Sequence, residues 1–372
     1  MKKRIAIWTF GGVGTGHFSQ GMPVMEQLIN GLSRNFQISV YSLSPPNQGY
    51  SNSNFVVRSP SKPIYPIFGW LSLVRLFLSD HSRNKYHLVM AFWGWPAGCI
   101  VTVLGKLLSL PSAVYLLGGD AAGVPAINYG ILHRPLLRNI AKWTYLNTNL
   151  LLAISQYQKD QLAAYGIRRS LAVIPWGVNT DRYQFKERST GDVVRFIHVG
   201  HLSPVKDQTT LIKAFAIINR KQLSHLTIFG YDTLNGRMQN LCSDLGIAGH
   251  VSFRDVVPHH EMPGHYQSAD VMLHTSLSEG QSMALTEAAA SGVLMAGTRV
   301  GLLYDLQECC GITVDHGNYE ELATKVLEIL QNRPAWEKSI RNARAWSENH
   351  SFAWTIKELT AQLSMKMKTA SQ

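Results

Sequence analysis

Short apolar segments with the character of β-strands alternate along the chain with segments of helical spacing, such as residues 22–32. Each apolar segment precedes a glycine, a proline or a polar turn. In the first half of the chain they are residues 4–9, 36–43, 88–92, 113–117, 150–154 and 172–174. Parallel sheets produce this pattern, because a covering helix must return every strand to the same edge. The sequence therefore predicts an α/β fold.

A junction rich in turn residues, residues 175–182 with the polar stretch 186–192, divides the chain. A second series of strands follows it, at residues 194–199, 225–229, 251–253, 271–275 and 293–296. A chain of 372 residues also exceeds what one hydrophobic core usually serves. We expect two doubly wound, Rossmann-like domains, over residues 1–175 and 176–345, that face each other across a cleft at their strand ends.

Positive charge is concentrated in the N-terminal half. Residues 1–175 hold 16 Lys+Arg and 4 Asp+Glu, a net charge of +12, whereas residues 176–372 hold 19 and 20, a net charge of −1. This asymmetry favours an anionic partner for the N-terminal half, which would be a membrane surface, a lipid phosphate or nucleic acid. No interleaved aromatic and basic motif of a known nucleic-acid module is found, so we do not expect nucleic acid as a partner.

Neither an export signal nor a membrane span is expected. Few apolar residues precede the first glycines, so the start does not read as a signal peptide. The uncharged run at residues 88–104 is broken by glycines and a proline, and it reads as a strand followed by a helix from about Gly98. The four cysteines show no C-x-x-C spacing, which favours a reduced, cytoplasmic protein.

Residues 66–78 form a strongly apolar segment with basic residues on both sides. Such a segment suits a helix that lies in the membrane interface. A core helix with solvated ends explains it equally well, so both interpretations stay open. The charge of the N-terminal half favours peripheral contact with the inner face of a membrane.

An anion site is indicated at residues 199–207, which leave a strand, turn and enter a helix. Such a junction presents unpaired backbone N–H groups and the positive end of a helix dipole. Lys206 adds a full positive charge. Taken alone, the segment is explained more simply by a surface lysine beside a helix start.

Two glutamates, Glu279 and Glu287, flank a predicted helix start at Ser282, Met283 and Ala284. The N–H groups of that first turn can receive a diphosphate, and the carboxylates can accept hydrogen bonds from hydroxyls on either side of it. A sugar and a ribose offer such hydroxyls. For an isolated pair of glutamates, two solvated side chains would be the commoner explanation.

Taken together and in this order, the motifs resemble the retaining glycosyltransferases of GT-B fold in the family 4 group, the glycosyl transferases group 1. The matching residues are 175–182, 200–207, 229–230, 257–258, 268–270, 298–301 and the pair Glu279 and Glu287. The resemblance covers most of residues 172–330 and, more loosely, the glycine-rich start. It also implies that the helix expected at residues 346–367, within the segment 346–372, returns to the N-terminal domain.

The resemblance implies retaining, metal-independent transfer of a sugar from a UDP- or GDP-sugar to a hydroxyl of a glycan or lipid-linked acceptor, in polysaccharide or glycolipid assembly. No cofactor is implied, and the chain has no D-x-D pair for a metal. Lys206 would bind the diphosphate, Glu279 the donor sugar and Glu287 the ribose, and Arg254 lies where the family contacts the base. The implied donor-binding residues are Gly14, Gly200, His201, Lys206, Arg254, Glu279, Gly280, Ser282, Met283, Ala284 and Glu287.

Two residues are candidates on the acceptor side. Asp120 follows the strand at residues 113–117, where the family often presents a histidine, and it either orients an acceptor hydroxyl as a catalytic residue beside Lys206 and Glu279 or caps the next helix. His17 either contacts the acceptor or packs. His17 also stands where a dinucleotide-binding loop needs its third glycine, which excludes that motif at residues 11–17.

Three positions depart from the family pattern. His201 replaces an arginine that supplies a second phosphate contact, Leu302 replaces a glycine, and Asn179 replaces a frequent aspartate. A neutral imidazole can donate one hydrogen bond to a phosphate. Diphosphate affinity is therefore the property that these departures affect most.

Two other functions stay open on the sequence alone. A nucleotide-sugar epimerase or hydrolase of the same fold would consume donor in the absence of acceptor. A non-catalytic nucleotide-sugar-binding protein would bind the donor without consuming it. Titration with donor, with and without acceptor, separates these functions from glycosyl transfer.

Replacing Lys206 by alanine tests its role at the diphosphate. Breaking the anomeric bond concentrates negative charge on the departing diphosphate, and a prearranged donor stabilises that charge more in the transition state than in the ground state. Because one such donor is worth about 3–4 kcal/mol, Lys206→Ala should lower turnover by about two to three orders of magnitude. Near-normal release of nucleoside diphosphate by the folded variant would refute this role.

Overall fold

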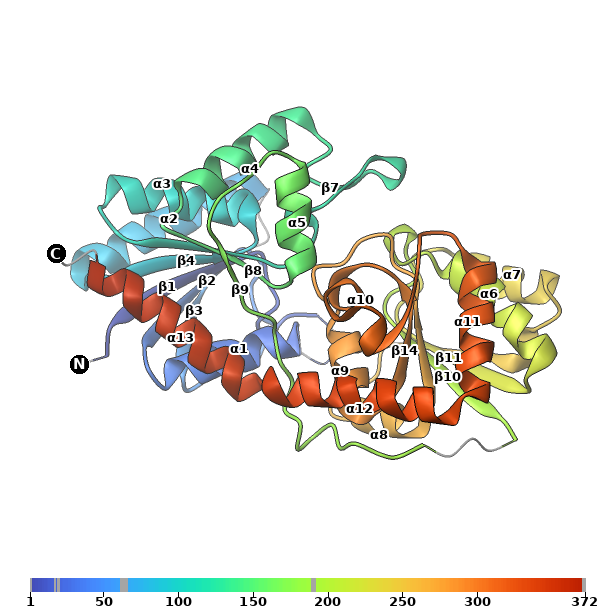
Figure 1. Cartoon of the computed structure of the whole chain (residues 1–372). Coiled ribbons are helices and arrows are strands. Elements are labelled where there is room, and N and C mark those ends of the chain that lie inside the picture. The colour runs from blue at the N-terminus through green and yellow to red at the C-terminus, as the bar shows by residue number, and fades with distance from the viewer. Residues whose placement is uncertain (1, 17, 19–20, 61–65, 189–191, 370–372) are drawn as a thin grey trace.

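The computed structural model describes residues 2–369 apart from residues 17, 19–20, 61–65 and 189–191. Two α/β domains lie side by side, and each is built on one parallel sheet with helices on both faces (Figure 1). The α/β fold with two doubly wound domains that the sequence predicts is therefore confirmed.

The N-terminal sheet contains seven parallel strands in the order β3-β2-β1-β4-β5-β8-β9. Their bounds are β1 Arg4–Thr9, β2 Gln37–Ser42, β3 Phe55–Arg58, β4 Leu88–Phe92, β5 Ser112–Leu116, β8 Leu150–Ala153 and β9 Ala172–Val173. A short antiparallel hairpin of β6 (Gly123–Val124) and β7 (Tyr129–Gly130) lies in the loop after β5. Because β1 pairs with both β2 and β4, the strand order reverses at β1.

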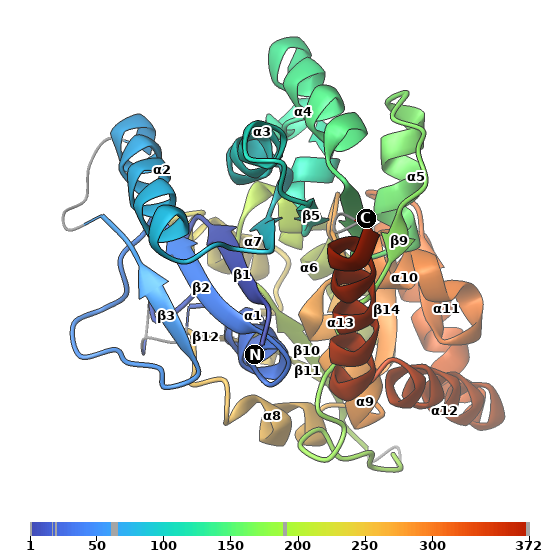
Figure 2. The same cartoon turned by 90° about the vertical axis from the view of Figure 1, so that its left-hand side faces the viewer.

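Helices cover both faces of this sheet (Figure 2). One face carries α1 (Pro23–Ser33) and α13 (Phe352–Thr369), and the other carries α2 (Pro66–Arg83), α3 (Cys99–Leu107), α4 (Pro135–Asn147) and α5 (Gln156–Ala164). Strands β4 and β5 are buried along their whole length. This double-sided cover explains why they read as continuous apolar runs in the sequence.

The C-terminal sheet contains six parallel strands in the order β12-β11-β10-β13-β14-β15, which is the Rossmann order 3-2-1-4-5-6. The strand bounds are β10 Val194–Val199, β11 Ser224–Phe229, β12 Val251–Arg254, β13 Val271–His274, β14 Leu294–Thr298 and β15 Gly311–Val314. The helices are α6 (Gln208–Lys221), α7 (Arg237–Asp244) and α11 (Tyr319–Gln331) on one face, and α8 (Met262–Ser268), α9 (Met283–Ser291) and α10 (Gly301–Leu306) on the other. Helix α12 (Arg333–Asn349) contributes buried residues to both faces.

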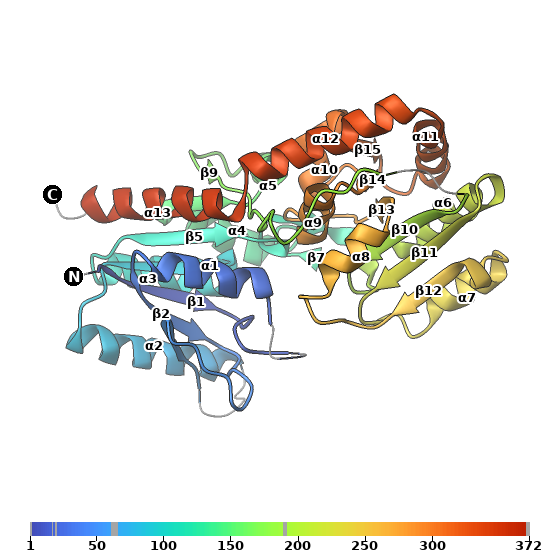
Figure 3. The ribbon, with the colours of Figure 1, turned by 90° about the horizontal axis from the view of Figure 1, so that it is seen from below.

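The sequence predicts a single helix at residues 346–367. This prediction is wrong, because the end of one helix and most of a second helix occupy this region. Helix α12 ends at Asn349 and α13 begins at Phe352, and together they run along both domains (Figure 3). At the break, the backbone N–H of Phe352 donates to the carbonyl of Val178 (3.1 Å). A hydrogen bond to the interdomain segment thus replaces a helical one.

Helix α13 packs on the N-terminal domain through a buried stripe of Leu359, Leu363 and Met367. Near its start, the hydroxyl of Thr355 donates to the carbonyl of Pro175 (2.8 Å). A Cβ added at Gly177 would collide with the carbonyl of His350, so the close crossing of the two chain segments requires glycine there. The domains are therefore joined by two chain segments that touch each other.

Several elements lie outside the predicted series, among them β3, β15, α4, α5 and α10. The uncharged run at residues 88–104 forms β4 and most of α3, as expected. Within the described ranges, no helix has both the length and the apolar character needed to cross a membrane.

Candidate functional site

The two motifs that the sequence singles out meet at the centre of the C-terminal sheet. Strands β10 and β13 are neighbours there, and the strand order reverses between them. The loop after β13 binds the loop after β10: the hydroxyl of Thr275 donates to the carbonyl of Asp207 (2.8 Å), and the N–H of Leu277 donates to the carbonyl of Val205 (2.8 Å). Doubly wound sheets bind ligands at this position.

Lys206 and Glu279 form an ion pair across these loops, with 2.5 Å between Lys206 Nζ and Glu279 Oε1. The same oxygen accepts hydrogen bonds from Ser276 Oγ (2.7 Å) and from His274 Nε2 (3.1 Å). Among the described residues, no hydrogen bond or ion pair engages the other oxygen, Oε2. One carboxylate oxygen is thus fixed by the protein, and contact of Glu279 with a donor sugar stays a prediction.

The charge of Glu279 is set by these neighbours. Burial by itself would raise the pKa of Glu279, but the Lys206 ammonium and the hydrogen bond from His274 outweigh it and hold that pKa well below its usual range. Burial lowers the pKa of His274, which keeps its ring neutral. Glu279 is therefore ionised at neutral pH.

The start of α9 provides the amide groups that the sequence predicts for a phosphate. Ser282 takes a left-handed backbone conformation, with φ +74°, and its side chain makes no capping hydrogen bond. Met283 and Ala284 form the first turn of the helix. An uncapped helix start with strained backbone is a common feature of anion and ligand sites.

Glu287 lies on α9 and is buried. Its Oε1 is 2.8 Å from His259 Nε2, and its Oε2 accepts a hydrogen bond from the hydroxyl of Tyr266 (2.9 Å). The hydroxyl of Tyr183 also contacts His259 Nε2 (3.1 Å). A ribose hydroxyl would have to share the carboxylate with these side chains, and the predicted ribose contact stays a prediction.

His201 and Gly200 form the turn after β10. His201 Nδ1 accepts a hydrogen bond from the N–H of Tyr231 (3.1 Å), which places the proton of the neutral ring on Nε2. The N–H of Gly200 donates to the carbonyl of Phe229 (2.9 Å) and holds the turn against β11. A hydrogen bond from His201 to a phosphate stays a prediction.

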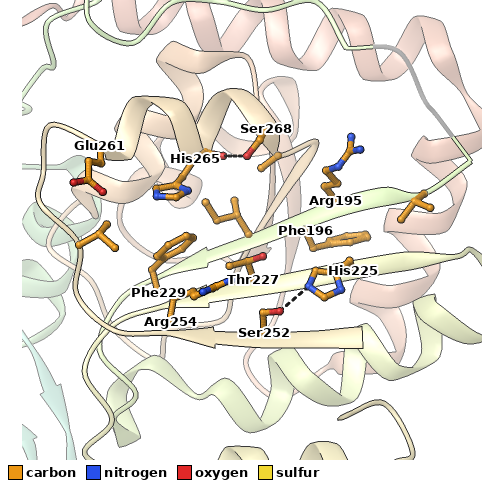
Figure 4. Close-up of a pocket in the computed structure, with 14 residues that line it drawn as sticks. Arg195, Phe196, His225, Thr227, Phe229, Ser252, Arg254, Glu261, His265 and Ser268 are labelled. Atoms are coloured by element: carbon orange, nitrogen blue, oxygen red, sulfur yellow. Dashed lines mark hydrogen bonds between the residues drawn. The ribbon is translucent and has the colours of Figure 1, made fainter. Parts of the chain in front are cut away.

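Arg254 ends β12 and lines a groove of about 580 Å³ on the α8 side of the sheet (Figure 4). Phe229, Glu261 and His265 also line it, and the ring centroids of Phe229 and His265 are 4.5 Å apart. The groove combines aromatic surface, a guanidinium and a carboxylate near the ends of β11 and β12. Contact between Arg254 and a base stays a prediction.

Gly280 lies where the loop after β13 touches the N-terminal domain. Its carbonyl accepts a hydrogen bond from Ser155 Oγ (2.5 Å), and a Cβ at this position would collide with the carbonyl of Leu117. The next residue, Gln281, binds the backbone of Trp176 in both directions, at 2.8 and 2.9 Å. The structure therefore explains this glycine by the domain contact, and a donor contact of Gly280 stays a prediction.

A second contact between the domains lies on α10. Both oxygens of Asp305 accept backbone N–H groups at the start of α5, from Gln156 and Tyr157, each at 2.8 Å. The hydroxyl of Tyr304 donates to Asp160 (3.0 Å). Burial raises the pKa of Asp305 to about 6, although the two N–H groups oppose this shift.

Asp120 lies in the loop after β5 and is buried. Its carboxylate accepts backbone N–H groups of Gly94 (2.8 Å), Gly118 (2.8 Å) and Leu117 (3.3 Å). Burial raises the pKa of Asp120, although these hydrogen bonds oppose the shift. The carboxylate ties the loops after β4 and β5 together, and a catalytic role for Asp120 stays a prediction.

Of the two predicted site residues in the glycine loop after β1, the structure describes Gly14 but not His17. Gly14 has φ +63°, and a Cβ there would overlap the ring of Tyr50, so glycine is required for packing. Its contact with the donor stays a prediction. His17 lies outside the described residues.

Sequence reasoning misses the residues that orient the carboxylates. His274 and Ser276 hold Glu279, His259 holds Glu287, and Gln281 joins the domains. The position of His274 and Ser276 could have revealed them. They lie on either side of Thr275 at the carboxyl end of a central strand, where side chains line the site. Their residue types alone do not distinguish them from ordinary core polar groups.

No metal site is evident in the described part of the chain, where no group of three or more His, Cys, Asp or Glu side chains is placed to hold an ion. The expectation that the reaction needs no metal stays a prediction.

Two doubly wound, parallel-sheet domains that lie side by side are the architecture of GT-B glycosyltransferases. Solved structures of this class resemble the whole chain. Sucrose-phosphate synthase from Thermosynechococcus elongatus superposes with a TM-score of 0.82 at 17% identity, covering 99% of this chain and 100% of that one. The Anabaena protein Alr3699/HepE, solved with UDP and glucose, gives 0.75 at 16% identity, covering 98% and 100%.

Two family models match consecutive parts of the chain: Glycosyltransferase Family 4 over residues 24–182 and Glycosyl transferases group 1 over residues 179–346. The chain belongs to this family of GT-B glycosyltransferases. A curated relative, the GDP-mannose-dependent alpha-(1-6)-phosphatidylinositol monomannoside mannosyltransferase of Mycobacterium tuberculosis, is 28% identical over 249 residues. That match spans 62% of this chain and 64% of the relative, slightly less than two thirds of its length.

Asp305→Asn tests the contact between α10 and α5. Since the pKa of Asp305 in the folded protein, about 6, lies above its ordinary value of 3.8, ionisation of this group weakens folding as the pH rises from about 4 to about 6. Asparagine cannot ionise, so the free energy of unfolding of the variant, relative to wild type, should increase over this window and level off at higher pH. Denaturant titrations across the window measure it, and a difference that does not change with pH would contradict the assignment.

Proposed function

We propose that this protein transfers a sugar, with retention and without a metal, from a UDP- or GDP-sugar to a hydroxyl of a glycan or lipid-linked acceptor. The observation that carries the proposal is the Lys206–Glu279 pair beside the uncapped start of α9. Family membership supports the same chemistry. Retention rests on the family resemblance alone.

The chemistry follows from charges. As the bond between the anomeric carbon and the diphosphate oxygen breaks, negative charge grows on the diphosphate. Lys206 and the first-turn amides of α9 would stabilise it, and His201 Nε2 would add one hydrogen bond in place of the arginine of other family members. Oε2 of Glu279 would accept a hydrogen bond from a donor-sugar hydroxyl, while Oε1 stays fixed by the protein.

The base would lie toward Arg254. The groove that Arg254 lines provides the aromatic rings of Phe229 and His265 for stacking and polar side chains for hydrogen bonds. The Mycobacterium relative is named for GDP-mannose, and the Anabaena structure holds UDP and glucose. Both nucleotides therefore belong in the test of donor identity.

A panel of UDP-, GDP- and ADP-sugars in thermal unfolding tests donor binding. A ligand at about 100 times its Kd stabilises the folded state by about 2.7 kcal/mol, which corresponds to a rise in Tm of several degrees. A UDP- or GDP-sugar should produce this rise, and Glu279→Gln should reduce it, whereas the exposed control Lys357→Ala should not. If no nucleotide sugar raises the Tm of the wild type, the proposal fails.

A turnover assay separates the alternative functions. Consumption of the donor in the absence of acceptor would favour a hydrolase or an epimerase. Binding of the donor without consumption would favour a non-catalytic protein.

A lipid-linked acceptor fits the N-terminal domain. Helices α2, α3 and α4 bury one side in the same core cluster over the sheet, with Trp70, Val101 and Ala141 among the buried residues. Their other side exposes large apolar residues, which are Ile67, Phe68, Leu71, Leu76, Leu78, Val103, Leu107, Leu136, Trp143 and Leu146. Helices α3 and α4 lie side by side, and α2 covers the same face of the sheet (Figure 2). The segment at residues 66–78 thus has a buried side that packs in the core and an exposed apolar side, which is the part that the proposed membrane contact would use.

Charge on the same helices favours an anionic membrane as the surface that covers them. They carry Arg75, Arg83, Lys106, Arg138 and Lys142, and the single acidic residue is Asp80, which pairs with Arg58 (3.1 Å). Exposed apolar side chains among basic ones suit the interface of an anionic bilayer. We therefore place the protein at the inner face of the cytoplasmic membrane, bound peripherally.

Co-sedimentation with vesicles tests this surface. The protein should bind vesicles rich in phosphatidylglycerol more tightly than neutral phosphatidylcholine vesicles, and salt should weaken the binding. Trp143→Ser should lower the partition coefficient roughly tenfold, because an apolar side chain of this size contributes about 1.5–3 kcal/mol on burial. The controls Leu223→Ser and Lys338→Glu, on the C-terminal domain, should not change it. If the protein sediments with neither type of vesicle at low salt, the proposed membrane contact is wrong.

A further inference from the structure

A layer of buried polar side chains lies directly beneath the loops that carry Lys206 and Glu279. His198 at the end of β10 and His274 at the end of β13 are fully buried, with ring centroids 6.2 Å apart. His198 Nδ1 donates to the carbonyl of Leu273 (2.9 Å), and its Nε2 accepts from the amide of Gln208 (3.2 Å). That amide also donates to the carbonyl of His201 (3.0 Å). The layer therefore supports the loop after β10 from below.

The proton of His274 can be assigned from its surroundings. Its Nε2 faces Glu279 Oε1 at 3.1 Å and Ser276 Oγ at 3.2 Å, whereas its Nδ1 is buried and has no hydrogen-bond partner among the described residues. A proton on Nδ1 would leave a buried donor unpaired and would turn a lone pair of Nε2 toward the carboxylate. The neutral ring therefore carries its proton on Nε2 and donates it to Glu279.

Three donors converge on one oxygen of Glu279. Besides His274, Ser276 Oγ donates to Oε1 (2.7 Å) and Lys206 Nζ pairs with it (2.5 Å). Lys206 has a flexible side chain, and the bound diphosphate would attract it as well. His274 is held rigidly within the core, and Ser276 lies on the short segment between β13 and Glu279. These two donors can keep the carboxylate in place when Lys206 turns toward the diphosphate.

We propose that His274 and Ser276 are positioning residues that hold Oε1 of Glu279, so that Oε2 is presented to the hydroxyls of the donor sugar. This inference rests on the proposed function, because it assigns Glu279 to the sugar. It has a specific consequence: loss of either donor should weaken binding of the sugar part of the donor and leave binding of the nucleoside diphosphate unchanged. A residue that only stabilises the fold would not separate these two affinities.

Isothermal titration of His274 variants with a nucleotide sugar and with the corresponding nucleoside diphosphate tests the proposal. His274→Leu should raise the Kd of the nucleotide sugar about tenfold or more, because it removes a hydrogen bond to a charged group, and the Kd of the nucleoside diphosphate should change less than about twofold. His274→Gln keeps an N–H donor of similar reach and should restore most of the affinity. Ser276→Ala, a milder change, should show the same selective loss of several-fold if His274→Leu does not fold.

Two further variants, measured in the same way, separate the positioning role from the proposed function. Thr313→Val replaces a buried polar side chain on β15, in the same row of the sheet as His274 but separated from it by β14, and both affinities should stay at the wild-type value. Glu279→Gln should reproduce the selective loss of sugar binding. If Glu279→Gln causes the selective loss and neither His274→Leu nor Ser276→Ala does, the positioning role is wrong while the proposed function survives. If Glu279→Gln itself leaves the binding of the nucleotide sugar unchanged, the assignment of Glu279 to the sugar fails first.

Discussion

The ion pair of Lys206 and Glu279 is the interaction on which the site depends, since it joins loops whose residues lie 73 positions apart in the chain. Two partly buried charges are costly to desolvate, and they are tolerated only when each is paired and further hydrogen-bonded. The parallel sheet provides this arrangement because β10 and β13 are adjacent and both end at the same edge. Thr275 and Leu277 then bind the two loops together, which keeps the side chains of Lys206 and Glu279 within reach of each other.

The loop that carries Glu279 is also bound to the other domain. Ser155 holds the carbonyl of Gly280, and Gln281 holds Trp176 at the interdomain segment. Helix α10, whose residue Leu302 donates its N–H to Gln281 (2.9 Å), carries the contact of Asp305 with α5. A rotation of one domain against the other would therefore act directly on the loop that carries Glu279. This gives a physical route by which domain closure can exclude water from the site.

Much of the fold can be predicted from the sequence because the central strands are buried on both sides and read as continuous apolar runs. Strand β3 is not predicted, since it has only four residues, of which only Phe55 is buried, and so short a segment gives no sustained apolar run. The break between α12 and α13 is set by Val178, which is distant in sequence, so no local pattern reveals it.

In the site, Lys206, Glu279 and Glu287 can be predicted from the order of the motifs. His274 and Ser276 acquire their role only from the direction in which the end of β13 points them. Gly280 shows the converse, because its residue type fits a ligand loop and a domain contact equally well.

A crystal structure with an intact nucleotide sugar, bound as a non-transferable analogue, tests the central claim most directly. The account predicts that Lys206 Nζ lies within hydrogen-bond distance, about 2.7–3.2 Å, of a diphosphate oxygen, and that Glu279 Oε2 lies equally near a hydroxyl of the sugar. A complex in which the sugar and diphosphate bind elsewhere, with Lys206 and Glu279 paired only to each other, would contradict it.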